Sequence, residues 1–264
     1  MGRHLETKKV YAYRELTENE INDNNLEKYQ KLENKNLLSF KKENNLIFFE
    51  MCNGGNLKYF NNFLHFGYDD LDEIQIQKII KQILNGLECL HKTRKIYNAI
   101  SLNNIYINFD DEIPSELGNT RHKEYLEKFK QNDEMNYTIK KKYFISKEER
   151  KKAIESKNNN DKEIKYYLPP EILKNFDNDD NNINTIAADM WSLGIITYKL
   201  LVGNNFLPFY ADNFIDLFNK INIGIIPFKS DLCPSFQIIQ FISSLLKLEP
   251  EERPTFDQIK KHEF

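Results

Sequence analysis

The apolar positions of the first 50 residues form short runs instead of long periodic stretches. Residues 10–14 alternate between apolar and polar side chains, which predicts a strand. Apolar runs at 37–40 and 46–49 flank the charged stretch 41–45, a pattern that indicates a hairpin. Residues 26–32 have the three-to-four spacing of a helix. We therefore expect this part of the chain to form a few strands around one helix.

The spacing becomes helical from about residue 71 onward. Between residues 76 and 90, apolar side chains recur every three or four positions, and acidic residues precede them. Residues 190–202 are apolar nearly all round, which predicts a buried central helix. From residue 214 to the end, amphipathic stretches alternate with prolines. The larger part of the chain is thus predicted to be helical.

Two segments interrupt the helical pattern. Residues 105–107 have the composition of a short strand, and residues 109–137 are highly charged with few apolar side chains, which indicates an insert. An Asn-Gly-Gly sequence at 53–55 is a turn or linker signal. We therefore expect a small strand-rich part over residues 1–52 and a larger helical part over 53–264.

Length and composition narrow the class of protein. The 264 residues suit one large domain or two small lobes, and 40% hydrophobic residues are enough to build a core. A net charge of −3 argues against a nucleic-acid binder, which usually has a strong basic excess. No apolar run reaches the ~18–20 residues that a membrane helix needs. Three cysteines cannot form a disulfide framework, which fits a reducing, cytoplasmic compartment. No metal-ligand spacing and no EF-hand loop is present.

Five motifs follow one another along the helical part. The motifs are GLECLH at 86–91, YNAISLNNI at 97–105, YLPPEIL at 167–173, ADMWSLGI at 188–195 and LKLEPEERPT at 246–255. In this order and spacing they resemble the C-lobe landmarks of eukaryotic protein kinases, in particular the calcium-dependent and calmodulin-dependent group. Residues 46–57 are similar to the hinge of that group. The resemblance implies an α+β, bilobal protein-kinase-like fold with a truncated antiparallel β N-lobe (1–52) and a mainly helical C-lobe (53–264).

The resemblance assigns structural roles to three charged residues. Glu171 and Arg253 fall on the positions that form a buried ion pair in the family, which ties the activation segment to the C-lobe helices. Asp189 falls where the family's aspartate hydrogen-bonds the backbone of the catalytic loop. Losing one partner of a buried ion pair costs roughly 3–5 kcal/mol, so the presence of both partners favours a retained fold.

The catalytic loop departs from the family pattern H-R-D-L-x-x-x-N. This chain has Y-N-A-I at 97–100, so Ala99 stands where the family has the aspartate that accepts the substrate's proton. A methyl group cannot accept a proton. Ser101 replaces the lysine two positions further on. Only Asn104 keeps the residue type of the metal-binding position, and in this asparagine-rich chain it is equally well a turn residue.

The magnesium-binding D-F-G triplet is also missing, in either of two alignments. In the first, residues 139–142 form the preceding strand and Tyr143-Phe144-Ile145 is the triplet. In the second, the triplet is residues 116–118. The first alignment is favoured, because it leaves an activation segment of ordinary length. Neither contains Asp-Phe-Gly, and in the first alignment a magnesium site would rest on Asn104 alone. Because a hard cation prefers carboxylate oxygens, we expect poor Mg²⁺ binding.

The nucleotide pocket that the resemblance implies is degraded. Residues 10–14 resemble the V-A-I-K strand, but Arg14 replaces the lysine, and its planar fork is not equivalent at a phosphate site. No G-x-G-x-x-G lid precedes this strand. Tyr106 replaces a slender aliphatic residue at the pocket floor, and Phe49 is the gatekeeper. The pocket positions are Ala12, Arg14, Phe49, Glu50, Cys52, Asn104 and Tyr106.

These losses favour a pseudokinase, a catalytically inactive domain that acts as a protein-binding scaffold or allosteric regulator. We expect its partners to be other proteins, an active kinase among them, and we expect neither ATP nor Mg²⁺ as a cofactor. The alternative is a divergent serine/threonine kinase with weak ATP binding and residual phosphotransfer. A third hypothesis is a nucleotide-binding sensor without catalysis.

Overall fold

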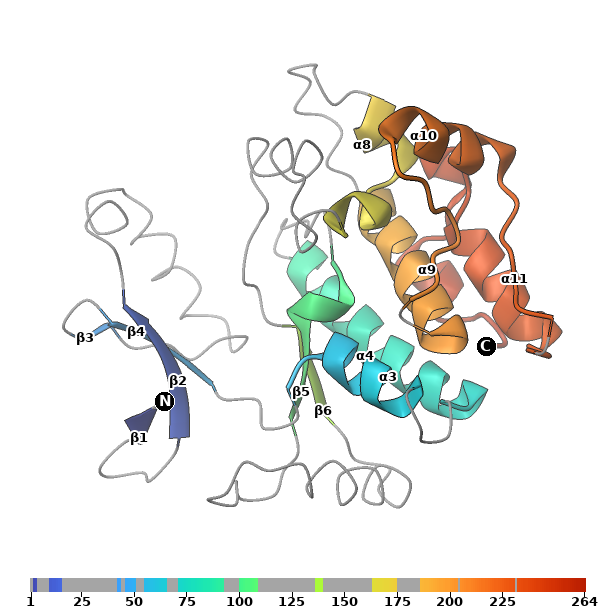
Figure 1. Ribbon diagram of the computed structural model, residues 1–264. Coiled ribbons are helices and arrows are strands. Elements are labelled where there is room, and N and C mark those ends of the chain that lie inside the picture. The colour runs from blue at the N-terminus through green and yellow to red at the C-terminus, as the bar shows by residue number, and fades with distance from the viewer. Residues whose placement is uncertain are drawn as a thin grey trace. The chain divides into compact units, whose positions relative to one another are not determined.

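A computed structural model shows how the chain folds (Figure 1). It describes residues 2–3, 10–15, 42–43, 46–50, 55–65, 71–92, 100–108, 136–139, 163–174, 186–203, 205–230 and 232–264. The chain forms two compact units, one of residues 1–54 and 108–133, the other of residues 55–107 and 134–264. Each unit is described by itself. The helix predicted at 26–32 lies outside the described residues.

The first unit contains a four-stranded sheet with the order β1-β2-β4-β3, in which neighbouring strands are antiparallel. Its strands are β1 (Gly2–Arg3), β2 (Val10–Glu15), β3 (Lys42–Glu43) and β4 (Leu46–Glu50). The strand predicted at 10–14 is therefore confirmed as β2. Its partner is β4, and the register places Ala12 opposite Phe49 and Arg14 opposite Ile47.

The predicted hairpin differs from the structure in its turn. The apolar pattern placed Lys42 and Glu43 in the turn, but they form β3, with Glu43 opposite Leu46 on β4. The connection is therefore confined to residues 44–45. Because β3 lies at the edge of the sheet, charged residues suit it, since they discourage pairing with other chains. The predicted first strand, 37–40, lies outside the described residues.

The second unit is mainly helical. Its α-helices are α3 (Leu57–His65), α4 (Glu73–Lys92), α8 (Pro170–Lys174), α9 (Ile186–Val202), α10 (Phe214–Ile223), α11 (Phe236–Leu245) and α12 (Phe256–Ile259). Short 3-10 helices are η1 (Leu102–Asn104), η2 (Ile164–Tyr167) and η4 (Pro250–Glu252). The helical patterns predicted between residues 76 and 90, at 190–202 and beyond residue 214 are confirmed by α4, α9, α10, α11 and α12, whereas α3, α8, η1 and η2 were not predicted.

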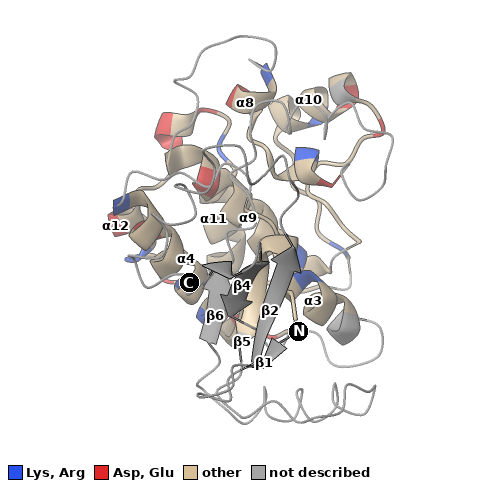
Figure 2. Ribbon diagram, turned by 90° about the vertical axis from the view of Figure 1, so that its left-hand side faces the viewer, with Lys and Arg blue, Asp and Glu red and all other residues tan. Residues whose placement is uncertain are grey.

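Helix α9 forms the centre of this unit. It is buried from Ala188 to Val202 without an exposed face, as its all-round apolar pattern predicts. α4 and α11 pack against it (Figure 1), and α4 buries the apolar stripe that runs from Ile76 to Leu90. Charged residues occur on α8, α10 and α12 (Figure 2), whereas α9 has only Asp189 and Lys199, which are both buried.

Gly194 lets α9 and the end of α11 approach closely. A Cβ atom placed on Gly194 would lie 2.8 Å from Leu246 Cδ2 and 3.0 Å from Leu245 Cβ. Cβ atoms do not tolerate contacts shorter than about 3 Å without a shift of the neighbouring atoms, because interiors are close-packed. The glycine is therefore required by packing, in the middle of the most buried helix.

Strands β5 (Ile105–Asn108) and β6 (Asn136–Ile139) form a separate two-stranded sheet. The strand predicted at 105–107 is confirmed. The strand predicted at 139–142 coincides with β6 only at Ile139, because residues 140–142 lie outside the described residues, and β6 begins within the predicted insert 109–137. Pairing with β5 places β6 at Asn136–Ile139.

Candidate functional site

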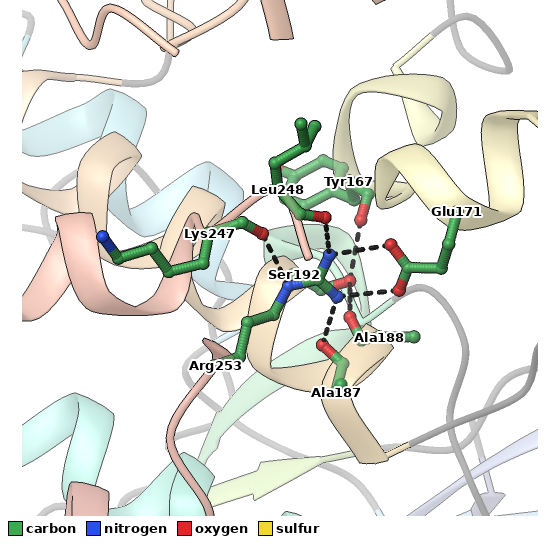
Figure 3. Close-up of polar contacts among 8 residues, drawn as sticks. All are labelled: Tyr167, Glu171, Ala187, Ala188, Ser192, Lys247, Leu248 and Arg253. Atoms are coloured by element: carbon green, nitrogen blue, oxygen red, sulfur yellow. Dashed lines mark hydrogen bonds and ion pairs between the residues drawn. The ribbon is translucent and has the colours of Figure 1, made fainter. Parts of the chain in front are cut away.

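Glu171 and Arg253 form a bidentate ion pair in the core of the helical unit (Figure 3). Nη1 of Arg253 donates to Oε1 of Glu171 and Nη2 donates to Oε2, each over 2.7 Å. The Arg253 side chain is fully buried, and that of Glu171 is 16% exposed. The pairing predicted from the kinase resemblance is therefore present.

The rest of the guanidinium group binds three backbone carbonyls. Nε donates to the carbonyl of Lys247 over 2.9 Å, Nη1 to that of Ala187 over 2.9 Å, and Nη2 to that of Leu248 over 3.2 Å. Together with the two bonds to Glu171, these contacts use all five N–H groups of the side chain. The ring of Trp191 lies 5.1 Å from the guanidinium carbon. Arg253 therefore joins α8, the start of α9 and the turn after α11.

Local sequence explains why both partners are in place. Pro170 starts α8 at a position that needs no backbone N–H donor, and Glu171 follows in the first turn, where a negative charge is favourable. Pro250 likewise starts η4, and Arg253 is the residue at which this short helix ends. Ser192 of α9 fixes the segment before α8, because its hydroxyl donates to the carbonyl of Tyr167 over 2.8 Å.

Asp189 has a side-chain partner that sequence reasoning missed. Its Oδ2 lies 2.6 Å from Nε2 of His91, the residue before the last of α4, and both side chains are buried. The His91 ring packs edge-on against Phe256 at 5.0 Å. Asp189 therefore links α9 to α4. Its expected bond to the catalytic-loop backbone stays a prediction, because residues 93–99 lie outside the described part of the chain.

A second charged cluster, which sequence reasoning also missed, joins Lys58 of α3, Glu163 and Lys199 of α9. Nζ of Lys199 lies 2.6 Å from Oε1 of Glu163, and Lys58 donates to Oε2. Burial alone would raise the pKa of Glu163, but the two ammonium groups hold it below its ordinary value. Burial lowers the pKa of Lys199, and Glu163 partly offsets that. The sequence signal for this cluster was Lys199 itself, because it is one of only two charged residues, with Asp189, in a mostly apolar helix that is buried on every side.

The residues of the predicted nucleotide pocket are divided between the two units. Ala12, Arg14, Phe49 and Glu50 lie on β2 and β4 of the first unit, where Ala12 and Phe49 are opposite each other and Glu50 is opposite Tyr11. Cys52 and Ala99 lie outside the described residues.

Asn104 and Tyr106 belong to the second unit. The backbone N–H of Asn104 donates to the carbonyl of Ser101 over 2.9 Å, which closes η1. Tyr106, on β5, forms a β-bridge with Asn56. The end of the hinge-like segment therefore runs beside the predicted pocket floor.

Within the described residues, no group of three His, Cys, Asp or Glu side chains could hold a metal ion. None of the described helices is both long and apolar enough to cross a membrane.

Solved structures show the class of this fold. The kinase domain of Rad53, in a crystal structure of that domain and SCD2, matches with a TM-score of 0.64 at 20% identity. This match covers 99% of the present chain and 81% of the Rad53 chain. A Rad53 chain in complex with AMP-PNP also gives a TM-score of 0.64, at 18% identity, over 97% of this chain and 58% of that one. The fold is therefore that of a protein kinase.

Sequence comparisons agree with the fold. The protein kinase domain profile matches residues 145–264. A probable serine/threonine-protein kinase PLK of Dictyostelium discoideum is 24% identical over 98% of this chain and 24% of its own length. A probable myosin light chain kinase of the same organism is 27% identical over 99% of this chain and 61% of its own length. The chain thus spans about a quarter of the length of the first of these relatives and about three fifths of the length of the second.

Proposed function

We propose that this kinase-like domain binds other proteins and does not transfer phosphate. The observation that carries the proposal is the contrast between Arg253 and Ala99. Arg253 keeps every contact that its side chain can make in the helical core. Ala99 stands where the kinase pattern has its proton-accepting aspartate. The packing of the fold is maintained while the group that performs the chemistry is missing.

Phosphoryl transfer depends on a few positioned charges, and several are absent from the sequence. Without the aspartate at position 99, no side chain accepts the proton of the substrate hydroxyl, which costs typically 10²–10⁴-fold in rate. The favoured D-F-G position is Tyr143-Phe144-Ile145, and β6 ends shortly before it, at Ile139, which supports this alignment. Asn104 is then the only remaining magnesium ligand of the family pattern, and one amide oxygen is a poor site for Mg²⁺.

The nucleotide pocket supports the same proposal. Arg14 takes the position of the phosphate-binding lysine, directly opposite Ile47 in the sheet. Phe49 at the gatekeeper position and Tyr106 at the floor position are both aromatic, and their rings would leave less room for a nucleotide. We therefore expect neither ATP nor Mg²⁺ to be a cofactor. The partner is a protein, and an active kinase is one candidate. Membership of the calcium- and calmodulin-dependent group remains part of this proposal.

The second candidate is a divergent serine/threonine kinase with weak ATP binding and residual phosphotransfer. The names of the relatives favour it, because both Dictyostelium relatives are described as probable kinases. A third candidate, a nucleotide-binding sensor without catalysis, differs from the second only in lacking phosphotransfer.

Two measurements on the full chain separate the three candidates. The first is the melting temperature with ATP, in the presence and absence of Mg²⁺, because a ligand that binds the folded state stabilises it by RT ln(1 + [L]/Kd). The second is transfer of radiolabelled phosphate by the wild-type chain and by an Asn104→Ala variant. We expect no shift and no transfer. A Mg²⁺-dependent shift without transfer supports the sensor, and transfer that Asn104→Ala abolishes supports the divergent kinase.

A further inference from the structure

Lys58 and Lys199 hold a single carboxylate between them. Glu163, directly before η2, presents Oε1 to Lys199 at 2.6 Å and Oε2 to Lys58, so each oxygen binds a different ammonium group. The lysines come from α3 and α9, which are far apart in the sequence but both belong to the helical unit. We call these two side chains the lysine clamp.

The clamp is partly shielded from solvent, but it is accessible from one side. The Lys199 side chain is 1% exposed, that of Glu163 16% and that of Lys58 32%. The positive charge of Lys58 also contributes to the lowered pKa of Lys199, after burial, which has the larger effect. Two ammonium groups that contact the same carboxylate repel each other, and a like charge nearby disfavours the charged form unless an anion offsets it. An anion in the clamp is therefore favourable, and the more exposed side is that of Lys58.

Two buried polar groups beside the clamp are not fully used. Asn61 of α3 donates its amide N–H to the carbonyl of Lys199 over 3.0 Å, but its Oδ1 has no hydrogen-bond partner within the described chain. The Tyr167 ring lies 5.5 Å from Nζ of Lys199, and its buried hydroxyl makes no hydrogen bond of ordinary geometry to described residues, although the backbone of Leu102 is near enough to lower its pKa slightly against the effect of burial. The charge of Glu163 raises the pKa of this hydroxyl, second to burial. That donor is thus within electrostatic reach of the bound anion.

We propose that the lysine clamp is an anion-binding site, filled by Glu163 in this structure, which binds a carboxylate or phosphate group of an acidic protein segment when Glu163 is displaced. A carboxylate and a phosphate share the chemistry that two ammonium groups recognise. The site is argued from its own contacts and does not require that catalysis is lost. It rests on the proposed function only in taking a protein as the source of the anion.

A Glu163→Ala variant of the full chain tests whether the clamp binds a free anion. Its melting temperature is measured in acetate, phosphate and chloride at equal ionic strength. Glu88→Ala is the matched control, because Glu88 also contacts two lysines, Lys260 at 2.6 Å and Lys92 at 3.4 Å, but at an exposed site. We expect acetate and phosphate to raise the melting temperature of Glu163→Ala above its value in chloride, and to leave Glu88→Ala unchanged.

Three outcomes of this experiment are decisive. Equal responses of the two variants overturn the proposal. If Glu163→Ala folds only when acetate or phosphate is present, the anion has replaced the missing carboxylate, and the proposal is supported. If the variant does not fold in any of the three salts, an added anion cannot fill the clamp, and the free-anion part of the proposal is overturned.

A Lys58→Met variant tests the partner while Glu163 keeps its ion pair with Lys199. Binding of a hexaglutamate peptide and of a phosphoserine peptide is measured for the wild-type chain, for Lys58→Met and for Lys260→Met as the control. We expect Lys58→Met to weaken binding roughly three- to tenfold and Lys260→Met to have no effect. A preference for one peptide identifies the anion. Undetectable binding to the wild-type chain, or equal loss in both variants, overturns the proposal, whereas the phosphotransfer assay tests the proposed function separately.

Discussion

Arg253 holds Glu171 through both ends of its guanidinium group, across 82 residues of sequence. The same side chain binds the carbonyls of Ala187, Lys247 and Leu248, so it has no unused N–H donor. A buried arginine with this number of partners is part of the packing of three segments. Loss of the Arg253 side chain should therefore destabilise the packing of all three segments, which would lower the free energy of unfolding.

Replacing Glu171 by Gln removes the negative charge and leaves the buried guanidinium without its counterion. Because one partner of a buried ion pair is then unpaired, we expect a loss of about 3–5 kcal/mol in the free energy of unfolding. Urea denaturation followed by circular dichroism measures it. The control is Glu88→Gln at the exposed contact with Lys260, which should cost at most about 1 kcal/mol. Similar losses in the two variants would contradict a structural role of the buried pair.

Gly194→Ala introduces the methyl group for which the structure leaves no room. The added Cβ would lie 2.8 Å from Leu246 Cδ2, so we expect a destabilisation of roughly 1–3 kcal/mol. In a Leu246→Ala background the obstacle is smaller, and the cost of Gly194→Ala should fall. The double-mutant cycle is measured by urea denaturation. Additive effects of the two substitutions would show that contact with Leu246 is not the reason why position 194 requires glycine.

His91→Leu removes the ring nitrogen that lies 2.6 Å from Oδ2 of Asp189. A hydrogen bond to a charged group contributes about 1.5–3 kcal/mol, and we expect a loss of this size in the free energy of unfolding. Adding Asp189→Asn to His91→Leu should recover part of the loss, since the buried carboxylate is then neutral. The free energies of unfolding of His91→Leu, Asp189→Asn and the double variant are compared. If the loss in the double variant equals the sum of the two single losses, His91 does not stabilise the charge of Asp189.

The lowered pKa of Glu163 predicts an acid-sensitive contribution to stability. In the folded state, Lys199 and Lys58 hold the pKa below the ordinary value of about 4.3 that the unfolded chain has. The contribution is therefore fully present above about pH 4.3 and is lost as the pH falls through the lowered folded-state pKa. Unfolding free energies measured across this range should depend less on pH in Glu163→Gln than in the wild-type chain. An identical pH dependence would contradict the assigned charge contacts.

Much of the helical unit could be predicted from the sequence, because its helices have strong local signals. The apolar repeat between residues 76 and 90 gave α4, and the all-round apolar stretch gave α9. The Glu171–Arg253 pair came from the kinase resemblance, not from spacing, since no local pattern joins residues 82 positions apart. The strands were harder, because a strand forms where a partner strand lies. Lys42 and Glu43, which were expected in a turn, thus form β3, and β6 begins within the segment that was expected to be an insert.

The sequence by itself determined which reactive groups are present. Ala99 cannot accept a proton in any fold. The lack of an aspartate at the D-F-G position is likewise read directly from the residue types in the sequence. Only the tertiary structure decided which charged side chains contact each other. No sequence pattern connects Lys58, Glu163 and Lys199, and none indicates that His91 and Asp189 are partners. The physical reason is that secondary structure follows from neighbours in sequence, whereas the environment of a buried charge depends on helices that become neighbours only when the core closes.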